Sequence, residues 1–376
     1  MSLSVDIRKR LGDFALEVSF DTQDAGVLAL LGPSGCGKSM TLKCIAGVER
    51  PDSGRIVLDG RVLFDSSARV DLPPQERHVG YLFQNYALFP NMSVWKNVLA
   101  AAHALPRDQR EAAARDAIRR MRLEGLEGHR PAELSGGQQQ RCAMARILVS
   151  RPDVILLDEP FSALDGYLRW QLEMELADTL GAFGGEVVLV SHNRDEVYRL
   201  CDTVCVISDG RGEPRIGIRE LFEAPRTLAA ALISGCKNVS RAAPRGEGLL
   251  RCEDWGVTLR TTLPVRNATH AGIRAHYLRH CPEGVATSSL TAGRAGEKNL
   301  IAGAVERVIE STFSTIVMVR TPGGGSLRWE LQKGEWRSVR EGLGADGRVC
   351  LAVAPADVMP LTDDARAEAM KEVPAP

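Results

Sequence analysis

The sequence of 376 residues is longer than one ordinary domain requires, and its length favours two or three domains. Its hydrophobic fraction of 44% and charged fraction of 25% are those of a globular protein, and its formal net charge of −1 gives no general attraction for nucleic acid. The N-terminus lacks the apolar core of a signal peptide and no stretch reaches the roughly 18 apolar residues that span a bilayer, so we expect a cytosolic chain with reduced cysteines.

The first half of the chain predicts an α/β core. An apolar strand at Val27–Leu31 runs into a glycine loop, and a helix follows over 39–48. Further apolar runs predict buried strands at 55–58, 78–83, 153–157, 186–190 and 203–208. Because continuous apolar strands that alternate with helices are typical of parallel sheets, we expect a mainly parallel sheet.

Two helical segments interrupt this alternation. The stretches 94–105 and 108–123 read as helices with no strand between them, which predicts a helical subdomain over about 85–150. Another amphipathic helix is expected over 165–182. We place the end of the α/β domain at about residue 235.

After about Gly235 we expect helices to stop and a small all-β domain to begin. Short β-like runs at 256–261, 316–320 and 348–353 are separated by Gly, Pro and Thr, with a turn at TPGGG. This region, 236–363, is long enough for a tandem pair of such domains, and 364–376 is expected to be a frayed tail.

A loop for phosphate binding follows the first buried strand. In GPSGCGKS, glycines allow backbone N–H groups to point inward at phosphates, and the helix beginning near Lys38 adds its positive end. Lys38 should reach the β- and γ-phosphates of a nucleotide, and Ser39 should bind Mg²⁺. Cys36, beside Lys38, is expected to react with thiol reagents. The predicted nucleotide-binding residues here are Gly32, Pro33, Ser34, Gly35, Cys36, Gly37, Lys38, Ser39 and Met40.

A pair of carboxylates ends the strand VILLD. Four apolar residues place Asp158 at the end of a buried strand, where it can hold Mg²⁺ through water. Glu159 follows and can orient or deprotonate the water that attacks the γ-phosphate. Without the phosphate loop, this stretch would be read as a buried strand with an acidic turn.

A second loop with phosphate-binding character indicates which class of nucleotide-binding protein this is. Ser135, Gly136, Gly137 and Gln138 precede a helix, and a Ser with two glycines at a helix N-terminus can bind phosphate. Since one nucleotide does not need two such loops from one chain, the second should serve a nucleotide held by another copy. With LSGGQ, the sequence resembles the ATP-binding subunits of ABC transporters over residues 1 to about 235.

The resemblance implies roles for further residues. Gln84 matches the family's Q-loop, which contacts Mg²⁺ or the water; Asp165 matches its D-loop, at the dimer interface; and His192 matches its switch histidine, which contacts the γ-phosphate and Glu159. Phe14 matches the aromatic residue that stacks on adenine, with a place in the core as the alternative. Two positions depart from the family: Met40 replaces a hydroxyl residue and Asn193 replaces an aspartate.

The resemblance also implies a mechanism and partners. Two copies would close head to tail around two ATPs with Mg²⁺, each site combining Lys38, Ser39 and Glu159 of one chain with Ser135 and Gly137 of the other. One ATPase unit followed by a small β domain resembles importer subunits, whose tail is a regulatory OB-like (TOBE-like) domain. The implied partners are an integral-membrane permease and, indirectly, an extracytoplasmic solute-binding protein, with the homodimer held peripherally at the cytoplasmic face of the membrane and no nucleic acid bound.

The sequence gives the least information about the transported solute. The segment 54–90, with RVLFDS followed by LPPQER, most resembles the ATPases of molybdate, tungstate and sulfate importers. None of these residues would touch the cargo, so this is an association rather than a mechanism. The alternatives are an importer ATPase for iron, a polyamine or a sugar, and a non-transport ABC ATPase. The resemblance also implies that the Q-loop and the segment 85–97, with Phe89 and Trp95, form the groove that receives the permease. The alternative is a packed loop and helix with both aromatic residues in the core.

Overall fold

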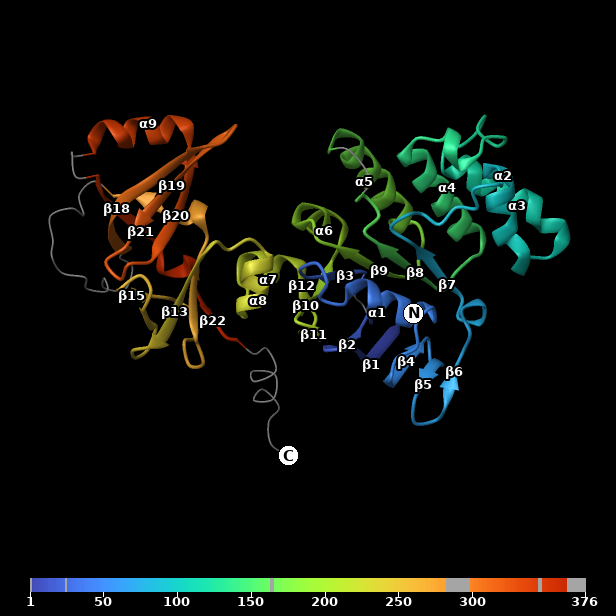
Figure 1. Cartoon of the computed structure of the whole chain (residues 1–376), viewed down its shortest axis with the longest axis horizontal. Helices are drawn as coiled ribbons and strands as arrows, with labels where there is room; N and C mark the ends of the chain where they lie inside the picture. Colours follow the sequence, from blue (N-terminus) through green and yellow to red (C-terminus); the bar gives the residue numbers. More distant parts are fainter. Residues whose placement is uncertain (1, 24–25, 163–165, 282–297, 344–346, 364–376) are drawn as a thin grey trace. The chain divides into compact units, whose positions relative to one another are not determined.

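The computed structural model describes residues 2–23, 26–162, 166–281, 298–343 and 347–363, and all structural statements concern these residues. Within them the chain forms two units, Met1–Ile218 and Arg219–Pro376, which are considered separately (Figure 1). The expected α/β core with helical subdomain, followed by a β-rich region, is confirmed. Asp165 and the tail 364–376 lie outside the described residues.

The parallel part of the first unit carries the loops of interest. Its five strands lie in the order β10-β3-β9-β8-β7 and all pair in parallel. The apolar residues of the four strands other than β7 are nearly all buried, as expected of strands covered on both faces, whereas Val79 and Tyr81 of β7 are half-buried. Their bounds are β3 Val27–Leu31, β7 Val79–Leu82, β8 Val154–Asp158, β9 Glu186–Ser191 and β10 Thr203–Ser208.

The expectation of a mainly parallel sheet is wrong, because an antiparallel part extends the same sheet. Strand β1 pairs antiparallel with β2 and β4, and β4 pairs with β5. The alternating pattern of β1, LSVDIRKRL, buries one face only, and Asp59-Gly60 forms a tight hairpin turn in which both residues have positive φ. The additional strands are β1 Leu3–Leu11, β2 Phe14–Asp21, β4 Ser53–Leu58, β5 Arg61–Asp65, β6 Val70–Asp71, β11 Arg211–Gly212 and β12 Ile216–Gly217.

Helices of the first unit form two groups. Helices α2, α3 and α4 lie together, as the expected helical subdomain, and share a core that includes Val98, Ile118 and Ala145 (Figure 1). Helices α1, α5 and α6 instead follow strands of the parallel part. The helix bounds are α1 Lys38–Ala46, α2 Val94–Ala101, α3 Arg107–Arg120, α4 Gly136–Val149, α5 Gly166–Gly181 and α6 Arg194–Leu200.

The second unit contains two five-stranded antiparallel sheets, β15-β14-β13-β16-β22 and β17-β21-β18-β19-β20. Leu259 and Ile273 of the first sheet share one core with Val317 and Leu351 of the second. The unit's elements, after α7 Ile218–Glu223, are α8 Leu228–Ile233, β13 Asn238–Pro244, β14 Leu249–Cys252, β15 Val257–Arg260, β16 His270–Ile273, β17 Arg279–His280, β18 Asn299–Glu310, β19 Ser314–Arg320, β20 Ser326–Gln332, α9 Lys333–Gly342, β21 Arg348–Val353 and β22 Val358–Leu361.

The expectation that helices stop after residue 235 is wrong, because α9 connects β20 to β21 over the second sheet (Figure 1). Its first turn is a capping box, in which Glu335 accepts from the backbone N–H of Gln332 at 3.0 Å. Trp336 and Val339, three residues apart, fall on one face and are buried in the core of this unit.

Candidate functional site

The phosphate loop is a tight connection between β3 and α1. Gly35 and Gly37 have φ of +82° and +106°, which residues with a Cβ rarely adopt. At Gly32 the constraint is space, because an added Cβ would lie 2.1 Å from the carbonyl oxygen of Ile207 in β10. Pro33, Ser34 and Gly35 are exposed. The loop therefore presents its backbone to solvent directly before a helix N-terminus, the geometry that binds phosphate.

Lys38 begins α1 and folds back into the loop. Its Nζ donates to the carbonyl oxygens of Gly32 and Pro33, both at 2.8 Å, and the residue is only 5% exposed. The ammonium is therefore held inside the loop by neutral acceptors. A phosphate placed there would offer it a charged acceptor in exchange, which makes a stronger hydrogen bond.

Ser39 and Asp158 meet across the base of the loop. The Ser39 hydroxyl donates to Oδ1 of Asp158 at 2.7 Å, and the carboxylate is nearly buried at the end of β8. A hydroxyl and a carboxylate are the hard oxygen ligands that Mg²⁺ uses together with phosphates and water. These two residues therefore fit the predicted magnesium site.

Tyr81 is a partner of Asp158 that the sequence analysis missed. Its hydroxyl donates to Oδ2 of Asp158 at 3.0 Å, and burial, with Asp158 nearby, raises the pKa of this tyrosine, so it remains a donor. Strands β7 and β8 are parallel neighbours, with Tyr81 opposite Leu156. The contact depends on that register, which the motif itself does not encode.

Glu159 and His192 form the second close pair of the site. Oε1 of Glu159 lies 3.1 Å from Nδ1 of His192. Glu159 has φ of +46°, a left-handed conformation that is costly for a residue with a side chain. Its backbone is fixed there, since its N–H donates to Val190 in β9 at 2.9 Å and its carbonyl accepts from the Ser162 hydroxyl at 3.0 Å.

A network behind His192 was also not anticipated. The Asn193 side chain caps α6 by accepting from the N–H of Asp195 at 3.0 Å. Ser191 donates to the carboxyl of Glu196 at 3.0 Å and accepts from the N–H of Asn193 at 2.9 Å. Glu196 is 4% exposed, and burial raises its pKa to about 7. His192 is thus flanked by two anchored residues.

The second glycine loop forms the start of α4. Ser135 is the N-cap: its hydroxyl accepts from the N–H of Gln138 at 3.3 Å, and the Gln138 side chain accepts from the N–H of Ser135 at 2.8 Å. Ser135 is exposed, while Gly136 and Gly137 open the helix. The local geometry fits a helix N-terminus open to a phosphate. Its use by another copy of the chain stays a prediction.

The other predicted residues stand apart from these contacts. Gln84 is exposed just after β7, and Phe14 and Met40 are half-buried and pack against the core of the sheet. Phe14 lies near the loop, because a Cβ on Gly37 would be 3.3 Å from its Cζ. Cys36 is 4% exposed and burial raises its pKa, and both features disfavour the expected reactivity of this thiol.

A groove of about 480 Å³ opens between the helical subdomain and the sheet. Tyr81, Phe83 and Phe89 contribute to its lining, and Arg146 lies over the Phe89 ring at 5.5 Å. Phe89 is 47% exposed, which leaves an aromatic surface open. Trp95 instead packs with the subdomain core, below Arg115. The groove holds one of the two aromatic residues expected there.

Comparison with known proteins gives a consistent result. The ABC transporter family matches residues 16–162. The sequence is 45% identical over 234 residues to "Spermidine/putrescine import ATP-binding protein PotA" of Methylococcus capsulatus, which covers 62% of this chain and 58% of that relative, less than two thirds of its length. In the described residues, no helix is both long and apolar enough to cross a bilayer.

Two other relatives are named for different transported solutes. "Molybdenum import ATP-binding protein ModC" of Paramagnetospirillum magneticum is 38% identical, over 62% of this chain and 67% of that protein. "Fe(3+) ions import ATP-binding protein FbpC" of Brucella abortus is 40% identical, over 70% and 74%. Among solved structures, cbiO1 of Clostridium perfringens, part of the ABC transporter complex cbiONQ, is 28% identical with a TM-score of 0.50, over 58% of this chain and 90% of that one.

Proposed function

Because the chain belongs to the ABC transporter family as an ATP-binding, ATP-hydrolysing subunit, we propose that it powers import of a solute through a partner permease. The observation that carries the proposal is the convergence of two pairs, Ser39 with Asp158 and Glu159 with His192, beside one phosphate loop. The first pair suits a metal and the second suits proton transfer, which together are the requirements of phosphoryl transfer to water.

Each residue then has a separate task. The loop amides and Lys38 would bind the phosphates of ATP, and Ser39 and Asp158 would hold Mg²⁺, which neutralises charge on the phosphates. The Glu159 carboxylate would orient the attacking water and accept its proton. His192 holds that carboxylate and leaves its other ring nitrogen available to the γ-phosphate. Gln84, which is exposed just after β7, would complete the metal site.

We propose further that two copies share each ATP. The loop at Ser135 lies at the start of a helix and is exposed, so a second chain could present it to the γ-phosphate. Asp165 is proposed at the contact between copies. Hydrolysis would remove the shared phosphate and release the two chains from each other.

The permease is proposed to occupy the groove beside Phe83 and Phe89. This surface joins Tyr81, which contacts Asp158, to the helical subdomain, so an occupant would contact both parts. Such a partner would hold the dimer at the cytoplasmic face of the membrane. A solute-binding protein outside the membrane would contribute indirectly.

We propose two alternatives for the transported solute. The segment 54–90 favours molybdate or a related oxyanion, with sulfate included, and one relative carries a molybdenum name. Relatives with polyamine and iron names are at least as similar, so a polyamine or ferric iron fits at least as well. The difference lies in the permease and binding protein, whose residues contact the solute.

The test is uptake by source cells whose only copy carries Glu159→Gln. Labelled molybdate, sulfate, spermidine and ferric iron are measured in parallel, with the unsubstituted gene as the control. Loss of one uptake with the others spared identifies that cargo. If no uptake falls, and the purified variant has lost ATP turnover, import of these four solutes is excluded although the ATPase assignment stands.

A further inference from the structure

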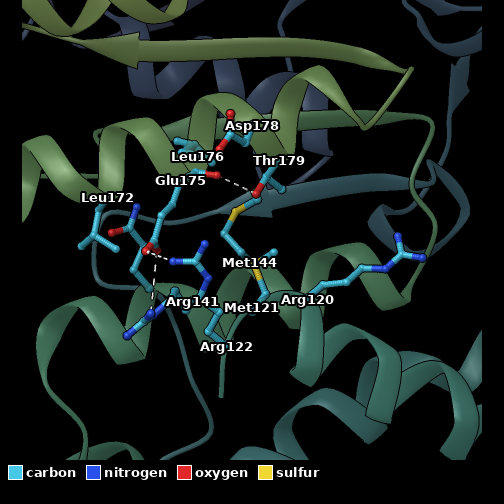
Figure 2. Close-up of a pocket in the computed structure, with 11 residues that line it drawn as sticks. Arg120, Met121, Arg122, Arg141, Met144, Leu172, Glu175, Leu176, Asp178 and Thr179 are labelled. Atoms are coloured by element: carbon cyan, nitrogen blue, oxygen red, sulfur yellow. Dashed lines mark hydrogen bonds and ion pairs between the residues drawn. The ribbon is translucent and has the colours of Figure 1, made fainter. Parts of the chain in front are cut away.

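A second cavity lies away from the proposed ATP site. It has a volume of about 130 Å³ and lies between α5, the middle of α4 and the C-terminal end of α3 (Figure 2). Its lining shares no residue with the phosphate loop, with the Asp158 or Glu159 pairs, or with the groove at Phe89. Nothing in the proposed reaction uses it.

One part of the cavity wall is apolar. Met121 and Met144 approach from the helical subdomain, and Leu172 and Leu176 from α5 (Figure 2). Met144, Leu172 and Leu176 are each at most 4% exposed. Water gains little at such a surface, whereas a small apolar group that fills it is stabilised by burial and by contact with polarisable methionine side chains.

Two residues of the wall, both on α4, each carry a buried polar atom without a partner. Oε1 of Gln140 and Nε of Arg141 are buried and make no hydrogen bond within the described residues. Gln140 as a whole is 3% exposed and lines the cavity. Because an unpaired buried polar atom costs about 1–3 kcal/mol, a ligand that pairs Gln140 Oε1, once that side chain turns toward the cavity, gains from that alone.

The three arginines at the rim already have acidic partners. Glu175 pairs with Arg122 at 3.0 Å and with Arg141 at 3.7 Å (Figure 2), and Arg120 pairs with Asp116 at 2.7 Å. A strongly anionic or cationic ligand would have to compete with these pairs. The cavity therefore suits a neutral molecule.

We propose that this cavity is a binding site for a neutral molecule with a compact apolar body and one hydroxyl group, of about the size of phenol. The volume supports this, since an apolar cavity of about 150 Å³ accommodates benzene. A hydroxyl can donate to an amide oxygen, so it can pair with Gln140 Oε1 once that side chain turns toward the cavity. The apolar body then covers Met121, Met144, Leu172 and Leu176.

The position of the site predicts an effect on the ATPase. Gln140 lies on α4, the helix whose first residues form the loop at Ser135, and the opposite wall is α5. A ligand that contacts both helices would restrict their relative movement. This part rests on the proposed function, in which the Ser135 loop must reach the ATP of another copy.

The test uses the full-length chain labelled at methionine methyl groups with ¹³C. Phenol is the probe, benzene is the apolar comparison, and the resonances are assigned by Met121→Leu and Met144→Leu. We expect phenol to shift the Met121 and Met144 resonances saturably and to leave Met40 and Met318 unchanged. Gln140→Leu should weaken phenol binding about tenfold and leave benzene binding within about twofold. Gln109→Leu, an exposed glutamine on α3, should change neither.

A second variant addresses the apolar part. Leu176→Phe should fill the cavity and abolish the shifts by both probes, with its thermal unfolding compared with that of the wild type. Absence of saturable shifts at Met121 and Met144, or equal shifts at all methionines, overturns the site. Unchanged phenol binding by Gln140→Leu overturns the role of the hydroxyl.

The effect on the ATPase is measured in the same samples as ATP turnover with and without phenol. We expect phenol to change turnover in the wild type and not in Leu176→Phe. Unchanged turnover at saturation overturns the coupling and keeps the site. Absence of turnover without phenol would instead contradict the proposed function, and the NMR titration would still test the site.

Discussion

Glu159 Oε1 lies 3.1 Å from Nδ1 of His192, across 33 residues of sequence. The two residues follow neighbouring parallel strands, β8 and β9, whose carboxyl ends meet at one edge of the sheet. A carboxylate that contacts an imidazole is held in one orientation, which is the requirement for a group that must aim a water molecule.

Glu159→Gln should bind ATP and lose turnover by a hundredfold or more, because the amide keeps the shape of the side chain but accepts no proton. The measurements are nucleotide binding, steady-state phosphate release and size-exclusion chromatography with ATP, in which we expect a trapped dimer. His192→Ala should lower turnover while leaving Glu159 free to move. Near-normal phosphate release by Glu159→Gln would contradict the assignment of this residue.

Tyr81→Phe should raise the Mg²⁺ concentration needed for half-maximal turnover about tenfold, because Asp158 loses the donor that orients it. A magnesium titration of ATP turnover measures this change. Tyr86→Phe is the matched control: its hydroxyl donates to the carbonyl of Pro160 at 3.3 Å and does not touch Asp158. Equal magnesium dependence of the two variants would show that Tyr81 acts only through packing.

Asn193→Ala should reduce the stability of the first unit by about 1 kcal/mol, because α6 loses the side chain that accepts from its first N–H groups. Asn193→Asp should remain within about 0.5 kcal/mol of the wild type, since aspartate caps helices equally well. Urea unfolding followed by far-UV circular dichroism compares the three proteins. Equal loss in both variants would point to a role of the Asn193 amide nitrogen instead.

Glu196 should make stability depend on pH. Its pKa is raised from 4.5 to about 7, chiefly by burial, so the folded protein keeps a proton that the unfolded chain releases between these values. The contribution of Glu196 to the free energy of unfolding is therefore fully present below pH 4.5. It falls by about 3 kcal/mol as the pH rises to 7. Glu196→Gln removes the dependence and should gain stability over the wild type from pH 5 to 8. A constant difference across that range would contradict the prediction.

Arg77→Met should destabilise the first unit by about 3 kcal/mol or more. The buried guanidinium donates to the carbonyls of Cys44 and Ile45 at the end of α1, at 2.8 and 2.9 Å, and these would lose their partner. Arg55→Met is the control. Arg55 is exposed, so its ion pair with Asp65 should contribute less than about 1 kcal/mol to the free energy of unfolding. Thermal unfolding of both variants measures the difference.

Much of the site could be predicted because its groups lie within short contiguous motifs. Lys38, Ser39, Asp158 and Glu159 each lie at or after the end of a strand whose apolar run is visible in the sequence. Tyr81 could not be found this way, since its contact depends on which strand lies beside β8. Helix α9 was missed because only Trp336 and Val339 mark its buried face among charged residues. These motifs do not identify the transported solute, because the residues that would contact it belong to other chains.

The left-handed backbone of Glu159 has a consequence for laboratory evolution. Glycine adopts φ near +46° without the penalty of about 1–2 kcal/mol that a Cβ incurs, so Glu159→Gly would relieve it. A library selected for heat resistance alone would therefore enrich glycine at this position and discard the carboxylate. Thermostable variants of this protein must be screened for turnover in the same round, because here resistance to heat and catalytic competence favour different amino acids.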